Sequence, residues 1–237
     1  MRHTFIPRCL IVSAALMSTI AFSNDVARIQ DAMRGIESMR RLPGSNMQLV
    51  QAAGNTFLMT ENGRFAVVQG RLYDVWHNVE IKSVSDLDRV AAKLDLSRMK
   101  LDFNELATLT FGTGKRLVTA FIDPRCEHCA TLLAQANSLT SEYQFRLVLL
   151  PLLGEQSVAE AKQLLCAPSG AVAALVAKRV ASLPKPPNDC ALAKLQKTII
   201  TARILGIESV PTVISPDGIV SRGVPESLSQ FLKGSQP

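Results

Sequence analysis

The sequence predicts an α+β chain with two folded parts: a small N-terminal part made of short strands, and a larger C-terminal part in which strands alternate with helices. Three observations predict this division. Short β-type segments separated by turns fill residues 47–81. A helical pattern occupies residues 85–100, and beyond residue 101 apolar runs of strand type alternate with helical periodicity. We therefore expect two domains joined by a linker helix.

Residues 1–23 have the features of an export signal. Arg2 and Arg8 make the start basic, residues 9–20 form an apolar run, and Ser23 is a small residue at the expected cleavage position. The apolar run is shorter than the roughly 20 residues that a transmembrane helix needs. We expect cleavage after Ser23, which leaves four of the five cysteines in the mature chain. An even count is typical of two disulfides in an oxidising compartment.

The composition does not point to a nucleic-acid partner. The chain has a formal net charge of +6 and a sequence pI of about 9.2. Its Lys and Arg residues, however, form no dense run with interleaved aromatic residues. We expect a mildly basic, solvated surface and no nucleic acid among the partners.

The N-terminal part, residues 24–84, is predicted to begin with a short helix within residues 26–41, because apolar residues recur there at helical spacing. The predicted strands lie at residues 47–53, 56–60, 65–69, 71–76 and 79–81, with turns between them. A module of short strands this small buries little apolar surface and leaves strand edges open. We therefore expect it to pair with a second copy of the chain, which makes a homodimer.

The linker begins with Ser85-Asp86-Leu87-Asp88, which has the pattern of a capping box at a helix N-terminus. Apolar residues then follow at helical spacing as far as Leu94. We expect a helix that runs to about Leu96 within a linker of residues 85–100.

The C-terminal part, residues 101–237, has a distinctive order of elements. The predicted strands lie at residues 115–122, 145–150, 212–215 and 219–222, and the predicted helices at 125–142, 158–183, 190–205 and 225–232. Strand, helix, strand, long helical region, β-hairpin and helix is the plan of a thioredoxin-like α/β domain with a helical insert.

A Cys-x-x-Cys motif, Cys126-Glu127-His128-Cys129, lies where the first of these strands gives way to the first helix. A helix N-terminus has unpaired N–H groups and a positive dipole end, and both stabilise a thiolate. We therefore expect Cys126 to be the attacking nucleophile. Cys129, about one turn further along, is expected to resolve a mixed disulfide at Cys126.

The two intervening residues are expected to tune this redox pair in opposite directions. A protonated His128 adds positive charge near the Cys126 sulfur and makes the disulfide form more oxidising. Glu127 adds negative charge that partly offsets this effect. We expect a fairly oxidising pair.

The motif has two other possible interpretations. It could be half of a zinc site with His128 as an extra ligand, but structural zinc needs four ligands, and the remaining cysteines, Cys166 and Cys190, are single and widely spaced. It could also be an inert structural disulfide, but a strand-to-helix junction favours exposure. We therefore expect a redox pair, with no metal and no other cofactor.

Two further features of the C-terminal part are open to more than one interpretation. A Cys166–Cys190 disulfide would close a loop of 25 residues and stabilise the fold by about 3.5 kcal/mol in the chain-entropy model. The alternative for these cysteines is a second redox pair. Pro211, after Val210, either forms a cis bond that leaves the preceding backbone free to pair with an extended substrate, or merely begins a strand.

Four stretches of the sequence, taken together in this order, resemble the DsbC/DsbG family of periplasmic disulfide isomerases. They are residues 63–75, residues 121–129, the Cys166/Cys190 pair and residues 205–212. The resemblance implies a periplasmic homodimer, joined by its N-terminal β domains, with a cleft that holds misfolded exported proteins. It also implies a cis Pro211 beside Cys126, a structural Cys166–Cys190 disulfide, and a membrane thiol reductant of the DsbD type.

The chain departs from the family pattern at three positions. Family isomerases usually carry Gly-Tyr between the cysteines and Thr before the cis-proline, where this chain has Glu-His and Val210. Thioredoxins and the related oxidases, by contrast, bury a carboxylate six residues before the first cysteine, where this chain has Ala120. This difference favours an isomerase over a reductase of the cytosolic type. Isomerase activity with chaperone activity is the prediction. The alternatives are a dithiol oxidase or cysteine sulfenic acid reductase, and a metal-binding or purely chaperone protein that uses Cys126, His128 and Cys129 as ligands.

Overall fold

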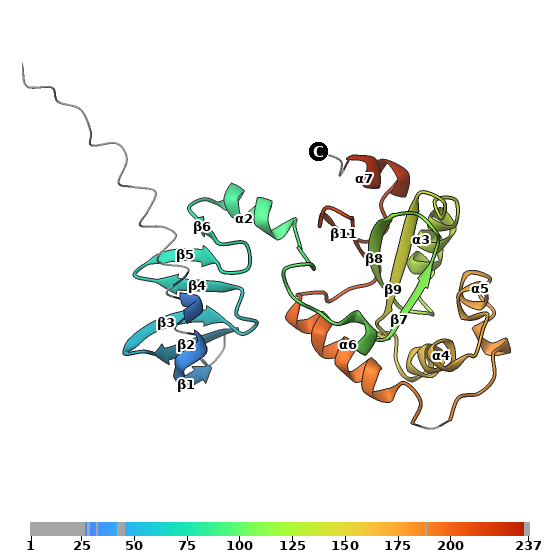
Figure 1. Ribbon diagram of the computed structural model, residues 1–237, viewed down its shortest axis with the longest axis horizontal. Helices are drawn as coiled ribbons and strands as arrows, with labels where there is room; N and C mark the ends of the chain where they lie inside the picture. The colour runs from blue at the N-terminus through green and yellow to red at the C-terminus, as the bar shows by residue number, and fades with distance from the viewer. Residues whose placement is uncertain (1–26, 28, 32, 42–45, 188, 235–237) are drawn as a thin grey trace, which may run out of the picture. The chain divides into compact units, whose positions relative to one another are not determined.

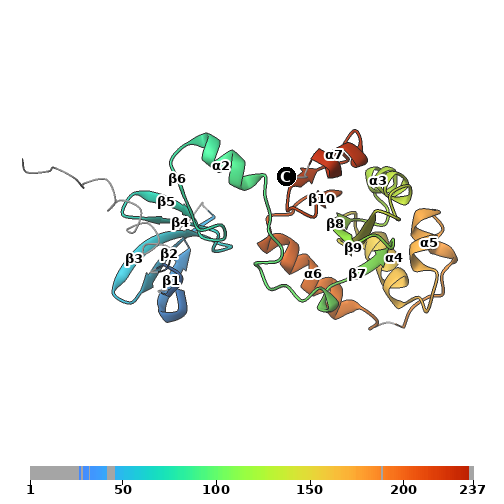
Figure 2. The same cartoon turned by 45° about the horizontal axis from the view of Figure 1, so that its top comes forward.

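The computed structural model describes residues 27, 29–31, 33–41, 46–187 and 189–234. The chain divides into two compact units, of which the first ends at Asp86 and the second begins at Leu87 (Figure 1 and Figure 2). The predicted export signal lies outside the described residues. Within the described ranges, no helix combines the length and apolar character that crossing a bilayer requires.

The first unit is a six-stranded antiparallel sheet whose strands follow one another in chain order. The strands are β1 (Ile36–Arg41), β2 (Met47–Ala52), β3 (Asn55–Thr60), β4 (Phe65–Val68), β5 (Arg71–Asp74) and β6 (Val79–Ile81). The five predicted strands are therefore confirmed as β2 to β6. Each pairs with its sequence neighbour across a short turn, because turn residues at 53–54 and 61–64 reverse the chain directly.

The helix predicted for residues 26–41 is wrong over its C-terminal half. A short 3₁₀ helix, η1 (Met33–Gly35), precedes β1, and residues 36–41 pair with β2. The spacing of Ile36 and Met39 indicated a helix, but all six residues of β1 are exposed. No buried stripe therefore selects a helix here, and hydrogen bonding to the open edge of β2 decides the conformation.

The small core of the first unit contains a buried ion pair. Asp74 is fully buried, and its Oδ2 accepts from the Arg64 guanidinium (3.3 Å) and contacts Nδ1 of His77 (2.7 Å). Its Oδ1 accepts from the amide of Trp76 at 3.0 Å. The Arg64 guanidinium also lies over the Phe65 and Trp76 rings, 4.9 and 5.0 Å from their centroids. The Asp74 carboxylate therefore links Arg64, directly before β4, to the end of β5 and to the turn that follows it.

The predicted linker helix is shorter than expected. Helix α2 (Val84–Ala91) ends five residues before Leu96, because the next residues pair with a β-hairpin of the second unit. Leu94 donates to the carbonyl of Gly218 (2.8 Å), and Val220 donates to that of Ala92 (2.9 Å). Gly218 has φ +80°, and a Cβ there would lie 3.1 Å from the Leu94 oxygen. This close approach favours glycine at that position.

The second unit is built on a five-stranded mixed sheet with the order β11-β10-β8-β9-β7. The strands are β7 (Thr108–Phe111), β8 (Arg116–Ile122), β9 (Tyr143–Leu149), β10 (Thr212–Ile214) and β11 (Val220–Arg222). Strands β8 and β9 are parallel and the other neighbours antiparallel. The sequence did not predict β7, a four-residue edge strand too short to give a clear pattern.

The helices of the second unit follow the predicted order. They are α3 (Glu127–Asn137), α4 (Glu155–Cys166), α5 (Ala171–Val176), α6 (Leu192–Ile204) and α7 (Leu228–Gly234), with 3₁₀ turns η2 (Phe103–Glu105) and η3 (Val180–Ser182). Helices α3 and α6 lie on opposite sides of the sheet (Figure 1 and Figure 2). The succession of strand, helix, strand, helical region, hairpin and helix is that of the predicted thioredoxin-like domain.

Replacing Asp74 with Ala is expected to destabilise the first unit by about 3 kcal/mol, because Arg64 would keep a buried charge without its partner. Trp76 is the only tryptophan in the chain, so its fluorescence during urea unfolding reports on this unit. The matched control is Glu80→Gln, in the more exposed Arg71–Glu80 pair, which should lower the unfolding midpoint much less. Equal shifts for the two variants would contradict the role given to Asp74.

Candidate active site

Cys126 lies at the N-cap of α3, at the end of a tight turn that follows β8. Its amide donates to the carbonyl of Asp123 (3.2 Å), and its backbone is extended (φ −77°, ψ 121°). The helix therefore begins at Glu127 and not at Arg125 as predicted, and it ends at Asn137 and not at residue 142. An extended N-cap aims its side chain at the free amides of the first helical turn.

The Cys126 sulfur has two polar neighbours. It accepts a hydrogen bond from the amide of Cys129 at 3.3 Å, and its thiol donates to the carbonyl of Val210 at 3.7 Å. Cys126 is half-buried. An amide that points at the sulfur holds the Cys126 side chain at the helix N-cap. The geometry therefore suits Cys126 as the attacking group.

Cys129 lies in a different environment although it is only one turn away. It is a free thiol with 1% of its surface exposed, inside the main core cluster of the second unit. Burial raises the pKa of the Cys129 thiol well above its usual range, and its hydrogen bond with Cys126 raises it further. Cys129 is therefore the protonated, inaccessible member of the pair, as a resolving cysteine should be.

Glu127 and His128, which were predicted to tune the pair, occupy the first turn of α3 and are both exposed. Any influence on the redox pair is therefore electrostatic and screened by water.

Val210 and Pro211 lie beside Cys126, where they were expected. The peptide bond between them is cis. Thr212, the next residue, begins β10 and is the partner of Phe121 in β8. Because β10 runs antiparallel to β8, its first residues lie at the same edge of the sheet as the nucleophile.

Asp123 is the functional residue that the sequence analysis missed. Its carboxylate is 1% exposed and accepts four hydrogen bonds, from the amides of Arg125 (2.8 Å), Leu152 (2.7 Å) and Leu153 (2.9 Å) and from the Ser157 hydroxyl (2.8 Å). Ala120, by contrast, is an apolar core residue. The available signal was an acidic residue directly after an apolar strand and three positions before the nucleophile.

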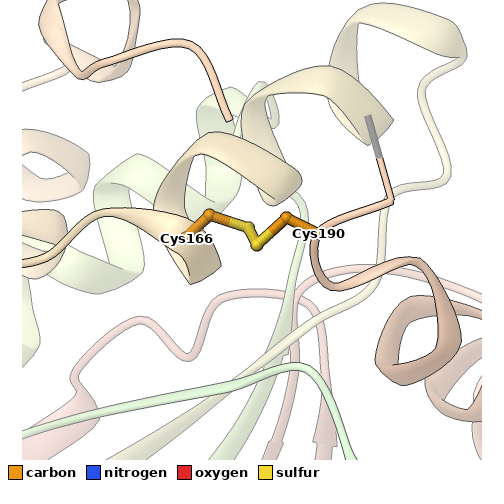
Figure 3. The surroundings of a disulfide bond; sticks show 2 residues. All are labelled: Cys166 and Cys190. Atoms are coloured by element: carbon orange, nitrogen blue, oxygen red, sulfur yellow. A yellow bond between two sulfur atoms is a disulfide. The ribbon is translucent and has the colours of Figure 1, made fainter. Parts of the chain in front are cut away.

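Cys166 and Cys190 are joined by a disulfide that links the last residue of α4 to the segment before α6, with their Cα atoms 6.3 Å apart (Figure 3). Ser157, in the first turn of α4, contacts Asp123 at the active site. From residue 157 to residue 166 the helix rises about 14 Å. This disulfide therefore lies at the end of α4 that is remote from the reactive cysteines, which favours the structural interpretation over a redox relay.

A cavity of about 250 Å³ adjoins both reactive cysteines. Its walls come from the turn before α3, from α4, and from the α5–η3 region. Arg125 and Glu160 form an ion pair at 2.7 Å on one wall, and the Lys178 side chain lines another. The nucleophile therefore borders a small polar recess as well as the sheet edge.

The grouping needed for a metal centre does not occur in the described part of the chain. No set of three or more His, Cys, Asp or Glu side chains is placed there to hold an ion. Cys126 and Cys129 are close together, but exposed His128 does not complete a ligand group with them.

Comparison with known proteins finds matches among solved structures, all at low identity. No family model matches the sequence, and no curated protein matches it. Three similar solved structures are a disulfide interchange protein from Neisseria gonorrhoeae, a periplasmic thioredoxin-like protein from Salmonella enterica serovar Typhimurium, and DsbG from Helicobacter pylori.

These structures are 22%, 18% and 16% identical to the chain, with TM-scores of 0.48, 0.45 and 0.36. The matches cover 57%, 65% and 79% of this chain and 99%, 98% and 97% of the other.

The raised pKa of Cys129 predicts how its alkylation by iodoacetamide depends on pH. Below the pKa of a thiol, the thiolate fraction rises about tenfold per pH unit. In the reduced protein, labelling of Cys129 should therefore keep rising to about pH 10 without a plateau, as measured by mass spectrometry. In urea-unfolded protein the same residue should level off near its ordinary pKa of about 8.5. A plateau below pH 9 in the folded protein would contradict the assigned burial.

Proposed function

We propose that the protein is a periplasmic thiol:disulfide interchange protein that isomerises non-native disulfides in exported proteins. The observation that carries the proposal is the contrast between the two thiols. Cys126 is accessible at a helix N-cap, and Cys129, whose amide points at the Cys126 sulfur, is buried and protonated. The predicted export signal supports the periplasm as the compartment.

The reaction begins when the Cys126 thiolate attacks one sulfur of a client disulfide. A Cys126–client disulfide forms, and the other client sulfur leaves as a thiolate. In isomerisation, another client thiolate attacks the same mixed disulfide, a new client disulfide forms, and Cys126 leaves as a thiolate. No electrons are gained or lost overall.

A second route leads to reduction. Cys129 loses its proton to a base and attacks the Cys126 sulfur, so that the client leaves as a thiolate and a Cys126–Cys129 disulfide remains. The raised pKa of Cys129 slows this step, because little thiolate is available. The client then has time to rearrange, which is the reason to favour isomerisation over simple reduction. When the second route is taken, a membrane thiol reductant of the DsbD type would restore the two thiols.

A dithiol oxidase is the second candidate. His128 between the cysteines and Val210 before Pro211 both favour it. In that case the enzyme starts from the Cys126–Cys129 disulfide, a client thiolate attacks Cys126, and a second client thiolate resolves the mixed disulfide. The client is oxidised and the enzyme is reduced by the same two electrons.

The first unit is proposed to hold two copies of the chain together. Strand β1 is a sheet edge with all six residues exposed, and Ile36 and Met39 are exposed apolar residues on it. An exposed, partly apolar edge strand is a template for pairing with another strand. Two such units would bring two active sites into one molecule, with room for a misfolded client and for chaperone activity.

The expected result in a refolding assay separates these candidates. Scrambled ribonuclease in a glutathione buffer should regain activity with the wild-type protein and not with Cys126→Ala. The redox potential should lie at about −180 to −120 mV, the range spanned by protein disulfide isomerase and a strong oxidase. Fast oxidation of reduced ribonuclease without rescue of the scrambled form would favour the oxidase. If Cys126→Ala restored the activity of scrambled ribonuclease as well as the wild-type protein does, both the isomerase and the oxidase would be excluded.

The homodimer is tested by the mass of the full mature chain in multi-angle light scattering. We expect twice the chain mass, and a shift toward the chain mass when Met39→Asp places a charge in the middle of β1. Ile200→Asp, an exposed apolar position of the second unit, serves as the matched control. A wild-type protein that runs as a monomer at micromolar concentration would exclude the dimer.

A further inference from the structure

Three chain segments lie side by side at the end of the second unit's sheet where strand β8 finishes. Strands β8 and β9 are parallel, and their last residues, Ile122 and Leu149, are partners. Strand β10 runs the other way, so its first residue, Thr212, pairs near the end of β8. The order β10-β8-β9 therefore sets Val210 on one side of the nucleophile turn and the residues after β9 on the other.

The segment after β9 presents two large apolar side chains to solvent. Leu152 and Leu153 are 44% and 55% exposed, although Leu150 and Pro151 just before them are buried. The chain then turns into α4 at Gly154, whose φ of +90° few other residues adopt. Two adjacent exposed leucines at the same end of the sheet as a reactive thiol are candidates for a functional surface.

Asp123 holds these leucines in their outward position. Its Oδ2 accepts from the amides of Leu152 and Leu153, at 2.7 and 2.9 Å. With both amides turned inward to a buried carboxylate, the loop cannot fold its side chains into the core without breaking charge-assisted hydrogen bonds. The same residue accepts from the Cys126 amide through its backbone carbonyl. The backbone amides of the two leucines and of Cys126 therefore all donate to Asp123.

We propose that Leu152 and Leu153 form a binding surface for apolar side chains that flank the client cysteine attacked by Cys126. The inference rests on the proposed function and names its substrate class: unfolded polypeptide segments in which cysteine has apolar neighbours. Such segments are buried in correctly folded proteins and exposed in misfolded ones. The surface thus favours clients whose disulfides are wrong over clients whose disulfides are already native.

Three charged side chains between the nucleophile turn and α4 are paired or enclosed. Arg125 and Glu160 neutralise one another at 2.7 Å, and the Asp123 carboxylate is enclosed by its four donors. An apolar client segment could therefore lie along the sheet edge, with its cysteine at Cys126 and its apolar neighbours on the two leucines.

The test compares two symmetrical peptide disulfides, the oxidised dimers of acetyl-Gly-Leu-Cys-Leu-Gly-amide and acetyl-Gly-Ser-Cys-Ser-Gly-amide. Attack by Cys126 on either one forms a Cys126–peptide disulfide and releases one peptide thiolate, so acid quenching and mass spectrometry give the rate. We expect the wild-type protein to react about tenfold faster with the leucine peptide, the preference that burial of one or two leucine side chains can produce.

The variant Leu152→Ser with Leu153→Ser should lose this preference, so that it reacts with the two peptides at similar rates. The matched control is Ile200→Ser with Ile204→Ser on α6, which removes two apolar residues that are 61% and 47% exposed. The control should keep the preference.

Three outcomes would overturn the inference. The wild-type protein could react equally with both peptides, or the Leu152/Leu153 variant could keep the preference. That variant could instead change the mass in light scattering, which would make the leucines a contact between copies of the chain. A wild-type protein that reacts with neither peptide would overturn the proposed function as well.

Discussion

Four hydrogen bonds to one buried carboxylate hold the active-site edge of the second unit together. Asp123 follows β8 directly and binds the turn before α3, two amides after β9 and a hydroxyl in α4. These donors are up to 34 residues away in the chain. Ionised acceptors form stronger hydrogen bonds than neutral ones, and a buried charge without partners is costly. The position of Cys126 relative to α4 and to the exposed leucines therefore depends on this side chain.

The chemistry of the site follows from the different solvent exposure of two thiols on one helical turn. Cys126 lies outside the helix at its N-cap, and Cys129 lies inside it and faces the core. The same turn that exposes the first sulfur directs the second toward Leu132 and Leu133. Helix geometry thus leaves one thiol accessible and encloses the other in the core.

Local patterns predicted those elements whose limits are set by nearby residues. Strands β2 to β6 were predicted to within two residues at each end, because turn residues separate them. Strand β1 was mistaken for helix, since a strand with every side chain exposed carries no burial pattern. The end of α2 and the role of Asp123 were missed for a different reason. Their partners, Gly218 and Leu152, are distant in sequence.

The Cys-x-x-Cys motif and its setting between a strand and a helix could be predicted from local sequence, because a helix N-terminus is made by residues within one turn of each other. Which thiol is buried, what anchors the nucleophile turn and which apolar residues stay exposed beside it are properties of the folded domain. These properties depend on the pairing of β8 with β9 on one side and β10 on the other. The physical reason is that burial and hydrogen bonding between distant segments are set by sheet order, which leaves no mark on local periodicity.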